Sequence, residues 1–423
     1  MVAFLLVLVV VLAVLGGVHW YVWRRLVRDV TVAGGLPRRL GTVAVVALPL
    51  FSLAALTSSR AGAPFWFQQV VAWPGFLWLA LLLYVTLALV VGEAVRPVLR
   101  ARLERRAKAA APVAVPASAP VAVPEPVSVP DSVSGVVTAP PAAEAPVDVS
   151  RRLFVSRVVG GSAAAVALGT VGYGAYGVLR GPRVKRVTVP LAKLSRAAHG
   201  YRIAVVSDIH LGPILGRAHS QRIVDAINST QPDLIAIVGD LVDGTVENLG
   251  PAAEPLARLR ARHGSFFVTG NHEYFSGADA WVDHVRELGL RPLRNERVEI
   301  AAGFDLAGVD DVAGESEGQG PDFGRALGDR DRARAAVLLA HQPIVIHDAV
   351  RNGVDLQLSG HTHGGQLWPG NYLAELANPT VAGLEQYGDT QLYVSRGAGA
   401  WGPPVRVGAP SDITIVELAS KQA

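Results

Sequence analysis

Five apolar runs in the second half of the chain each end at glycine, aspartate or histidine. Short uninterrupted apolar runs are typical of strands that are covered on both faces by other layers. Loops at the carboxyl ends of such strands meet at one edge of a sheet. We therefore expect a layered α/β domain whose polar motifs gather in one place. The motifs are Asp208-Ile209-His210, Gly239-Asp240, Gly270-Asn271-His272-Glu273, His341-Gln342-Pro343 and Gly360-His361-Thr362-His363.

The expected elements alternate between strand and helix from residue 202 onward. Apolar runs and helical spacing supply the evidence for each. Strands are expected at 203–207, 234–238, 265–269, 336–340, 356–359, 392–395 and 413–418, helices at 220–228, 255–262 and 278–288, and a hairpin across 298–309.

Two motifs carry pairs of ligand-type side chains two residues apart. Asp208 and His210 form one pair, and His361 and His363 form the other. Alternate residues of an extended segment face the same way, so each pair can point at one ion. A metal site built from these pairs is the simplest prediction.

The other motifs complete a set of oxygen and nitrogen ligands. The carboxylate of Asp240 has two oxygens that can bridge two ions, Asn271 offers a neutral carbonyl oxygen, and His341 adds an imidazole. The chain has no cysteine, which excludes thiolate ligands. Such a set suits Mn, Fe, Zn or Ni and does not choose among them.

Taken in order, the motifs resemble those of the calcineurin-like metallophosphoesterase family. The segment at 395–404 is similar to its membrane-associated or exported bacterial branch, and the resemblance covers about residues 200–418. It implies a four-layer α/β/β/α sandwich that hydrolyses phosphate esters at two divalent metals, which activate a shared water.

The resemblance also implies a role for each residue. The first metal would be held by Asp208, His210 and His363, the second by Asn271, His341 and His361, with Asp240 bridging and His272 donating a proton to the leaving oxygen. Arg396 is expected either to bind a substrate phosphate or to form a structural salt bridge. Asp243 is expected to fix its loop rather than bind metal.

The first 180 residues have a different character. Half of the chain is apolar and only 17% is charged, and the apolar excess lies at 1–18, 40–56, 70–91 and 153–179. About 20 apolar residues cross a bilayer core. The run at 40–56 contains Pro49, so an interfacial or re-entrant element is the alternative there. The run at 153–179 is rich in small residues and is alternatively a stalk helix on the membrane.

Arginine placement predicts the orientation. Five arginines lie between the first two runs and more lie at 96–108, whereas the loop between the second and third runs has only Arg60. Basic loops stay cytoplasmic, which puts the second half of the chain outside the cell. Segment 150–155, with Arg151-Arg152, also resembles a twin-arginine export signal; a plain basic flank is the other interpretation, and both give the same orientation.

These observations predict a domain organisation and a function. We expect a membrane region at 1–105, an Ala/Pro/Val-rich linker at 106–150, a fourth helix or anchor at 151–180 and the phosphoesterase domain at 181–423. The predicted protein is a multi-pass, membrane-anchored hydrolase of a phosphate ester or pyrophosphate bond, with manganese among its candidate metals and phosphodiesters and lipid-linked or other envelope phosphates among its candidate substrates. The alternatives are a metal-binding sensor or scaffold without turnover, and a domain that serves a transporter. No nucleic-acid partner is expected, and the sequence does not fix the oligomeric state.

Overall fold

The computed structural model describes residues 2–110 and 147–422 and divides the chain into two compact units. The helical unit comprises residues 1–43 and 85–166, and the sheet unit comprises residues 44–84 and 167–423. The linker predicted at 106–150 falls largely on residues 111–146, which lie outside the described residues.

Four long helices carry the apolar runs. They are α1 (Val2–Trp23), α2 (Leu36–Thr57), α3 (Phe65–Ala110) and α4 (Val147–Leu179), and a π-helical segment, Arg24–Arg28, follows α1. Among the described residues, these four are long and apolar enough to cross a membrane by length and composition. Within the helical unit α3 and α4 pack closely, because a Cβ added at Gly92 would lie 2.6 Å from Val159.

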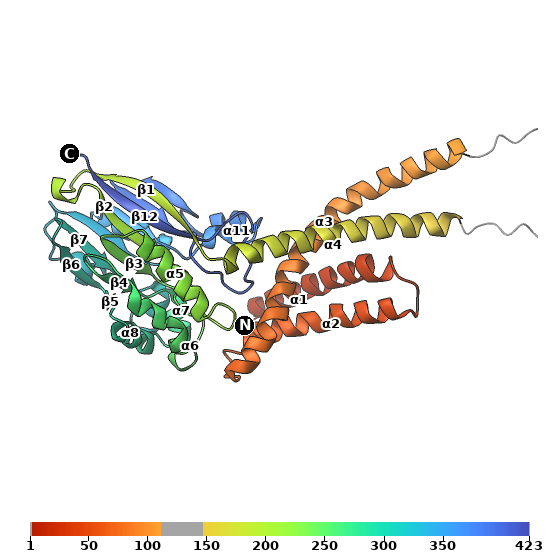
Figure 1. The fold of residues 1–423 in the computed structure, drawn as a ribbon, viewed down its shortest axis with the longest axis horizontal. Coiled ribbons are helices and arrows are strands. Elements are labelled where there is room, and N and C mark those ends of the chain that lie inside the picture. The colour runs from red at the N-terminus through yellow and green to blue at the C-terminus, as the bar shows by residue number, and fades with distance from the viewer. Residues whose placement is uncertain (1, 111–146, 423) are drawn as a thin grey trace, which may run out of the picture. The chain divides into compact units, whose positions relative to one another are not determined.

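Two six-stranded sheets lie in the second half of the chain (Figure 1). The first runs in the order β1 (Arg183–Leu191), β12 (Asp412–Ser420), β2 (Tyr201–Val206), β3 (Leu234–Val238), β4 (Ser265–Val268) and β5 (Arg291–Pro292). The second runs in the order β10 (Gly383–Tyr387), β11 (Thr390–Val394), β9 (Leu356–Ser359), β8 (Ala335–Leu339), β7 (Phe304–Gly308) and β6 (Glu296–Ile300). β2, β3 and β4 pair in parallel, as do β8 and β9.

The main core lies between the inner faces of the two sheets, where Val205 and Val238 of the first join Leu306 and Val337 of the second in one buried cluster. The helices α5 (Arg217–Ser229), α6 (Val246–Ala253) and α8 (Ala278–Glu287) cover the outer face of the first sheet. On the second sheet α9 (Phe323–Leu327) and α10 (Ile346–Arg351) do the same. This arrangement confirms the predicted four-layer α/β/β/α sandwich.

Shorter elements complete the sheet unit. They are the α-helices α7 (Asn271–Ser276) and α11 (Gly370–Ala377) and the 3-10 turns Arg196–Ala198, Glu254–Arg258, Val312–Glu317, Pro343–Val345 and His363–Gly365.

The helix expected at 255–262 is wrong. An α-helix occupies Val246–Ala253 and gives way to the 3-10 turn Glu254–Arg258. Pro255 has no N–H to donate to a helical ladder, which explains the tightening at this point. The edge strands β1 and β10 were also not predicted, because their sequences mix charged and apolar residues.

Candidate metal centre

All five predicted motifs lie at the carboxyl ends of strands. β2, β3 and β4 end immediately before or within one residue of the motifs that begin at Asp208, Gly239 and Gly270, and β8 and β9 precede His341 and Gly360 in the same way. Backbone hydrogen bonds then hold the loops together: Asp208 donates to Gly239, and Gly360 donates to the carbonyl of His341. Parallel neighbours therefore bring distant parts of the chain to one edge.

The backbone of this edge is strained. Asp208, His210, Asp240, His361 and His363 all have positive φ angles, between 48° and 74°. Residues with a Cβ rarely adopt this region, and such strain tends to collect at functional sites. The left-handed turns aim successive side chains inward rather than continuing the strands. The polar residues are therefore held in place at a cost to local backbone energy.

One cluster contains Asp208, His210 and His363, whose ligand atoms lie within 4.8 Å of one another. The two Nε2 atoms of His210 and His363 are 3.0 Å apart, and His363 Nε2 is 3.3 Å from Asp208 Oδ1. All three side chains are buried. Three ligand-type atoms at this separation have the spacing of groups that share one ion.

A second cluster contains Asp240, His341 and His361. His341 Nε2 is 3.1 Å from Asp240 Oδ2, and the same oxygen is 3.8 Å from Nε2 of His210 in the first cluster. Asn271 Oδ1 lies 3.0 Å from His361 Nδ1. Asp240 thus lies between the two clusters, and every side chain that the sequence predicted as a ligand is present at this edge.

The hydrogen bonds of two histidines show that these residues fit a metal. Nδ1 of His341 donates to the Val238 carbonyl, and Nδ1 of His210 donates to Asp243. A histidine that holds a metal ion is neutral, and in that form the Nε2 lone pair of each ring faces a carboxylate oxygen of Asp240. His341 Nε2 is buried without a hydrogen-bond partner among the described residues. Lone pairs and carboxylate oxygens that face one another repel unless a cation lies among them.

The pKa shifts of the site also indicate that these residues fit a metal. Burial, together with the charge of Asp240, raises the pKa of Asp208. Burial also acts to raise the pKa of Asp240, but the charges of His341 and His210 outweigh it and lower that pKa. The pKa of His361 falls to about 4 through burial and the charge of His341. Carboxylates held this close, beside a neutral imidazole, suit divalent cations.

His272 lies next to His210 and Asp240. Its Nδ1 is 2.7 Å from Asp243 Oδ1, and its backbone N–H donates to Asp240. Burial acts to lower the pKa of His272, but the hydrogen bond and the charge of Asp243 raise it to about 9. Phe275 and Trp401 contact the imidazole edge-on, with ring centroids 5.6 and 5.9 Å away.

Asp243 does more than was expected from the sequence. Its Oδ1 accepts from Nδ1 of both His210 and His272, so it fixes two rings as well as its loop. The charge of His210 and these two bonds outweigh burial and lower the pKa of Asp243. The only signal in the sequence was its place three residues after Asp240.

Glu273 belongs to one of the five motifs, but the sequence indicates no role for it. The structure shows its buried carboxylate accepting from the backbone N–H groups of Asp240, Leu241 and Gly270, at 3.0, 2.8 and 2.6 Å. Burial and the charge of Asp240 raise the pKa of Glu273 to about 7. This side chain ties the loop after β3 to the loop after β4.

Arg406 was missed altogether. It is buried, donates through Nη1 to the carbonyl of His363 and through Nε to the carbonyl of Gly399, and its Nη2 lies 2.9 Å from His363 Nδ1. Burial lowers the pKa of Arg406 to about 10, so it stays charged at neutral pH. Burial and this charge lower the pKa of His363. No motif marks the residue.

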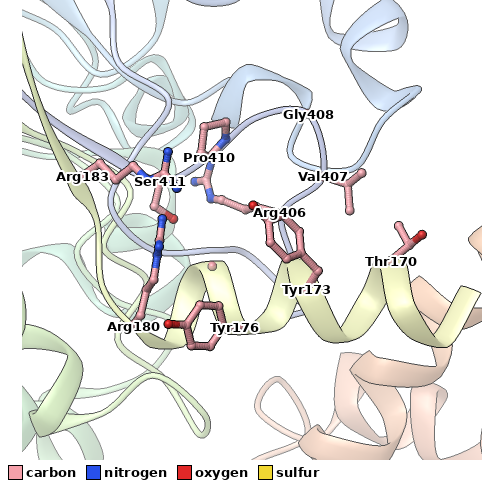
Figure 2. A pocket seen from close by; sticks show the side chains of 11 residues that line it. Thr170, Tyr173, Tyr176, Arg180, Arg183, Arg406, Val407, Gly408, Pro410 and Ser411 are labelled. Carbon is pink, nitrogen blue, oxygen red and sulfur yellow. The ribbon is translucent and has the colours of Figure 1, made fainter.

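Arg406 also lines a cavity of about 360 Å³ beside the C-terminal part of α4, where Figure 2 shows it among Tyr173, Tyr176 and Arg180. Gly174 makes this approach feasible, because a Cβ there would lie 2.7 Å from Val405. The loop that supports His363 is consequently packed against α4.

Two further arginines are close to the site. The side chain of Arg396 lies against Gly364, next to His363, and makes no ion pair within residues 2–110 and 147–422. The exposed Arg60, from the turn between α2 and α3, has its guanidinium carbon 5.8 Å from the ring centroid of Phe275. Both are positive side chains near the candidate ligands, and the predicted structural salt bridge of Arg396 is not seen in that part of the chain.

Comparison with known proteins gives matches over the same region. Residues 201–365 match the family model for calcineurin-like phosphoesterases. A "Transmembrane protein with metallophosphoesterase domain" of Danio rerio is 39% identical over 264 residues, which are 59% of this chain and 60% of that protein. An "Uncharacterized metallophosphoesterase" of Helicobacter pylori is 38% identical over 260 residues, which are 60% of this chain and 69% of that protein. The Bacillus subtilis "Uncharacterized metallophosphoesterase YkuE" is 30% identical over 286 residues, which are 64% of this chain and 98% of that protein. The match spans less than two thirds of the Danio rerio relative.

Proposed function

The chain belongs to the calcineurin-like metallophosphoesterase family, and we propose that it hydrolyses a phosphate ester or pyrophosphate bond with two divalent metals, next to a membrane. The observation that carries the proposal is the convergence of two ligand clusters on Asp240, with His272 beside them. A site that only bound metal would have no need of a proton donor beside it.

The two clusters divide the ligands between two ions. Asp208, His210 and His363 would hold one, Asn271, His341 and His361 would hold the other, and Asp240 would be shared between them. Divalent ions bound in such a site lower the pKa of water and neutralise charge on phosphoryl oxygens. The donor set of imidazole and oxygen is compatible with Mn, Fe, Zn or Ni, and manganese is the first ion to test.

His272 supplies the proton for the leaving oxygen. Asp243 holds its Nδ1, so Nε2 is the nitrogen that remains to donate. General-acid catalysis of this kind contributes a factor of about 100 to 10,000 in rate. Asp243 is a positioning residue, because it acts through His210 and His272.

The surroundings of His272 suggest where a substrate lies. Arg396 and Arg60 offer charge for phosphoryl oxygens, while the exposed rings of Phe275 and Trp401 flank His272 and offer an apolar surface. A substrate with a phosphate next to an apolar group would use both features. Lipid-linked phosphates have this chemistry and reach a membrane-anchored enzyme by lateral diffusion.

The proposed location is the cell membrane, with the phosphoesterase domain at 181–423 outside the cell. Four helices apolar enough to cross a bilayer support anchoring, and the arginine bias of the loops supports the orientation. In the helical unit Arg25 pairs with Glu93, and Arg157 donates to the carbonyl of Val30. The three arginine-rich segments therefore lie together, as a topology that keeps them on one side requires.

The test is hydrolysis of bis-p-nitrophenyl phosphate by the intact protein in detergent, with each of the four metals added separately. We expect metal-dependent turnover that Asp240→Asn abolishes, while Asp225→Asn, an exposed aspartate on α5, leaves it unchanged. Metal binding without turnover on any phosphate substrate would favour a sensor or scaffold instead. A lipid-extract screen, read by phosphate release and mass spectrometry, then identifies the substrate class.

A further inference from the structure

The helical unit contains a cavity with an unusual concentration of arginine. Seven arginines and one acid, Asp29, line a cavity of about 660 Å³. They come from three segments that are distant in sequence: the π-helical turn after α1 with the start of α2, the second half of α3, and the start of α4. An adjoining cavity of about 540 Å³ shares Arg24, Arg25, Arg96 and Arg100 and adds Glu93.

Arg96 is the most telling of these residues. It is only 4% exposed and lines both cavities, yet its Nε and Nη2 have no hydrogen-bond partner within residues 2–110 and 147–422. Its one ion pair there is with Glu93, at 3.7 Å. Glu93 is already engaged, because it accepts from Tyr21 and from Arg25.

Other donors around the cavity are also unused. Nε of Arg24 and Nε of Arg25 are buried without a hydrogen-bond partner in the described part of the chain. Arg38, in contrast, is committed to the carbonyls of Arg28 and Thr31 and contributes only its charge. A buried guanidinium with free N–H groups is costly unless an acceptor is supplied. The cavity therefore offers donors that suit an anion with several acceptor oxygens.

We propose that this cavity binds the phosphate oxyanion of an anionic phospholipid, with Arg96 as its central ligand. Arginine presents a planar set of donors that matches phosphate oxygens in pairs. The arginines begin directly after the apolar run of α1, at Trp23, and so lie where a membrane-crossing segment meets the headgroups. Basic pockets between membrane helices at this depth suit acidic lipid headgroups.

Basic residues that only set the topology of a membrane protein need charge but no particular geometry. They have no reason to bury a guanidinium with free donors or to surround a cavity. The two explanations therefore differ in whether the position of an arginine matters. Arg105 offers a matched control, because it lies on the same helix, is exposed and does not line either cavity.

The experiment is native mass spectrometry of the intact, delipidated protein in detergent. It is titrated separately with phosphatidylglycerol, phosphatidylcholine and inorganic phosphate. We expect phosphatidylglycerol to bind in preference to phosphatidylcholine. Arg96→Gln should weaken phosphatidylglycerol binding at least about tenfold, the loss expected when paired charge-assisted hydrogen bonds are removed. Arg105→Gln should bind like the unmodified protein.

A second variant covers the chance that Arg96→Gln does not fold. Arg100 and Arg152 are exposed cavity arginines, so Arg100→Gln/Arg152→Gln leaves no buried gap and should also weaken binding; Arg105→Gln/Arg106→Gln is its control. Equal weakening in the cavity and control variants, or equal binding of the two lipids, would overturn the proposal. Binding of inorganic phosphate without phosphatidylglycerol would overturn it too, because the source of the anion would then not be lipid.

Discussion

The two units differ in whether their buried charged groups have hydrogen-bond partners. In the sheet unit Glu273 accepts from three backbone N–H groups, and Asp243 accepts from two imidazoles. In the helical unit Arg96 is also buried, but its Nε and Nη2 have no hydrogen-bond partner in the described part of the chain, and arginine outnumbers acid around its cavity. The first arrangement satisfies its charges within the chain, whereas the second leaves guanidinium donors for an acceptor from outside it. The chain thus contains a candidate metal centre whose supporting groups are paired and a cavity lined by arginines whose donors are only partly used.

The largest difference that we expect between the units is the effect on stability of replacing a glycine by alanine. At Gly360 an added Cβ would overlap Ser207 and Asp208, whereas at Gly161 on α4 it would meet nothing within 4 Å. We expect Gly360→Ala to cost about 3 kcal/mol or more and to displace Asp208, because overpacking a tight site forces the backbone to move. Gly161→Ala should be neutral or stabilise its helix by up to about 1 kcal/mol. Thermal unfolding and bound-metal content of both variants measure the difference; similar behaviour would break the comparison.

The second prediction concerns Asp243, a charged group of the sheet unit that accepts hydrogen bonds from two histidines. Asp243→Asn keeps the volume of the side chain but removes the charge that holds His210 and His272. Loss of a group that orients a metal ligand typically costs about 10- to 100-fold in activity or metal affinity. We expect this loss in kcat on bis-p-nitrophenyl phosphate with the melting temperature little changed. Restoration of the unmodified rate in Asp243→Glu would support positioning, while full activity in Asp243→Asn would show that the two bonds are dispensable.

These residues also show how far the sequence could lead. β3 and β9 begin and end where the apolar runs predicted, and the antiparallel hairpin of β6 and β7 turns at Gly303 as expected. Short apolar strands are specified locally by their composition, and their carboxyl ends then bring the motifs together. Sequence reasoning therefore succeeded in placing side chains at strand ends.

Sequence reasoning did not identify residues that act through long-range contacts. Arg406 supports His363 from 43 positions away, and Glu273 joins two loops through backbone bonds. Neither contact leaves a periodic pattern in the sequence. The strand β1 was missed for a related reason: its charged residues are tolerated because it pairs with β12 at the edge of the sheet. In the helical unit hydropathy located the helices but said nothing of the partners of Arg96.

A buried histidine provides the third prediction, which concerns stability against pH. Burial, with the charges of Arg222 and Arg406, lowers the pKa of His219 from 6.5 to about 3. The unfolded chain therefore binds a proton before the folded one does, and folding stability falls as pH drops from 6.5 toward 3. One such group contributes a slope of up to about 1.4 kcal/mol per pH unit.

His219→Phe tests that slope. Both ring nitrogens of His219 are buried without a hydrogen-bond partner among the described residues, so an apolar ring of similar size suits the site. We expect the melting temperature of the intact protein to decline less between pH 6.5 and 5 in the variant than in the unmodified chain. Parallel pH profiles would mean that His219 titrates in the folded state as it does in the unfolded one.

The smallest expected effect concerns an exposed charge rather than a buried one. Arg60 lies over the ring of Phe275, which in turn contacts His272, but its guanidinium is open to solvent. Exposed charge pairs contribute about 0.2 to 1 kcal/mol, so Arg60→Ala should raise KM for an anionic substrate by up to about fivefold and leave kcat unchanged. Arg332→Ala, an exposed arginine on a distant loop, serves as the control. Raising the salt concentration should reduce the KM difference between Arg60→Ala and the unmodified protein, because screening weakens an exposed charge far more than a buried one. A KM difference that persists at high salt would mean that the charge of Arg60 is shielded from solvent, like the charges of Asp208 and Asp240. A fall in kcat would mean that Arg60 takes part in the chemical step.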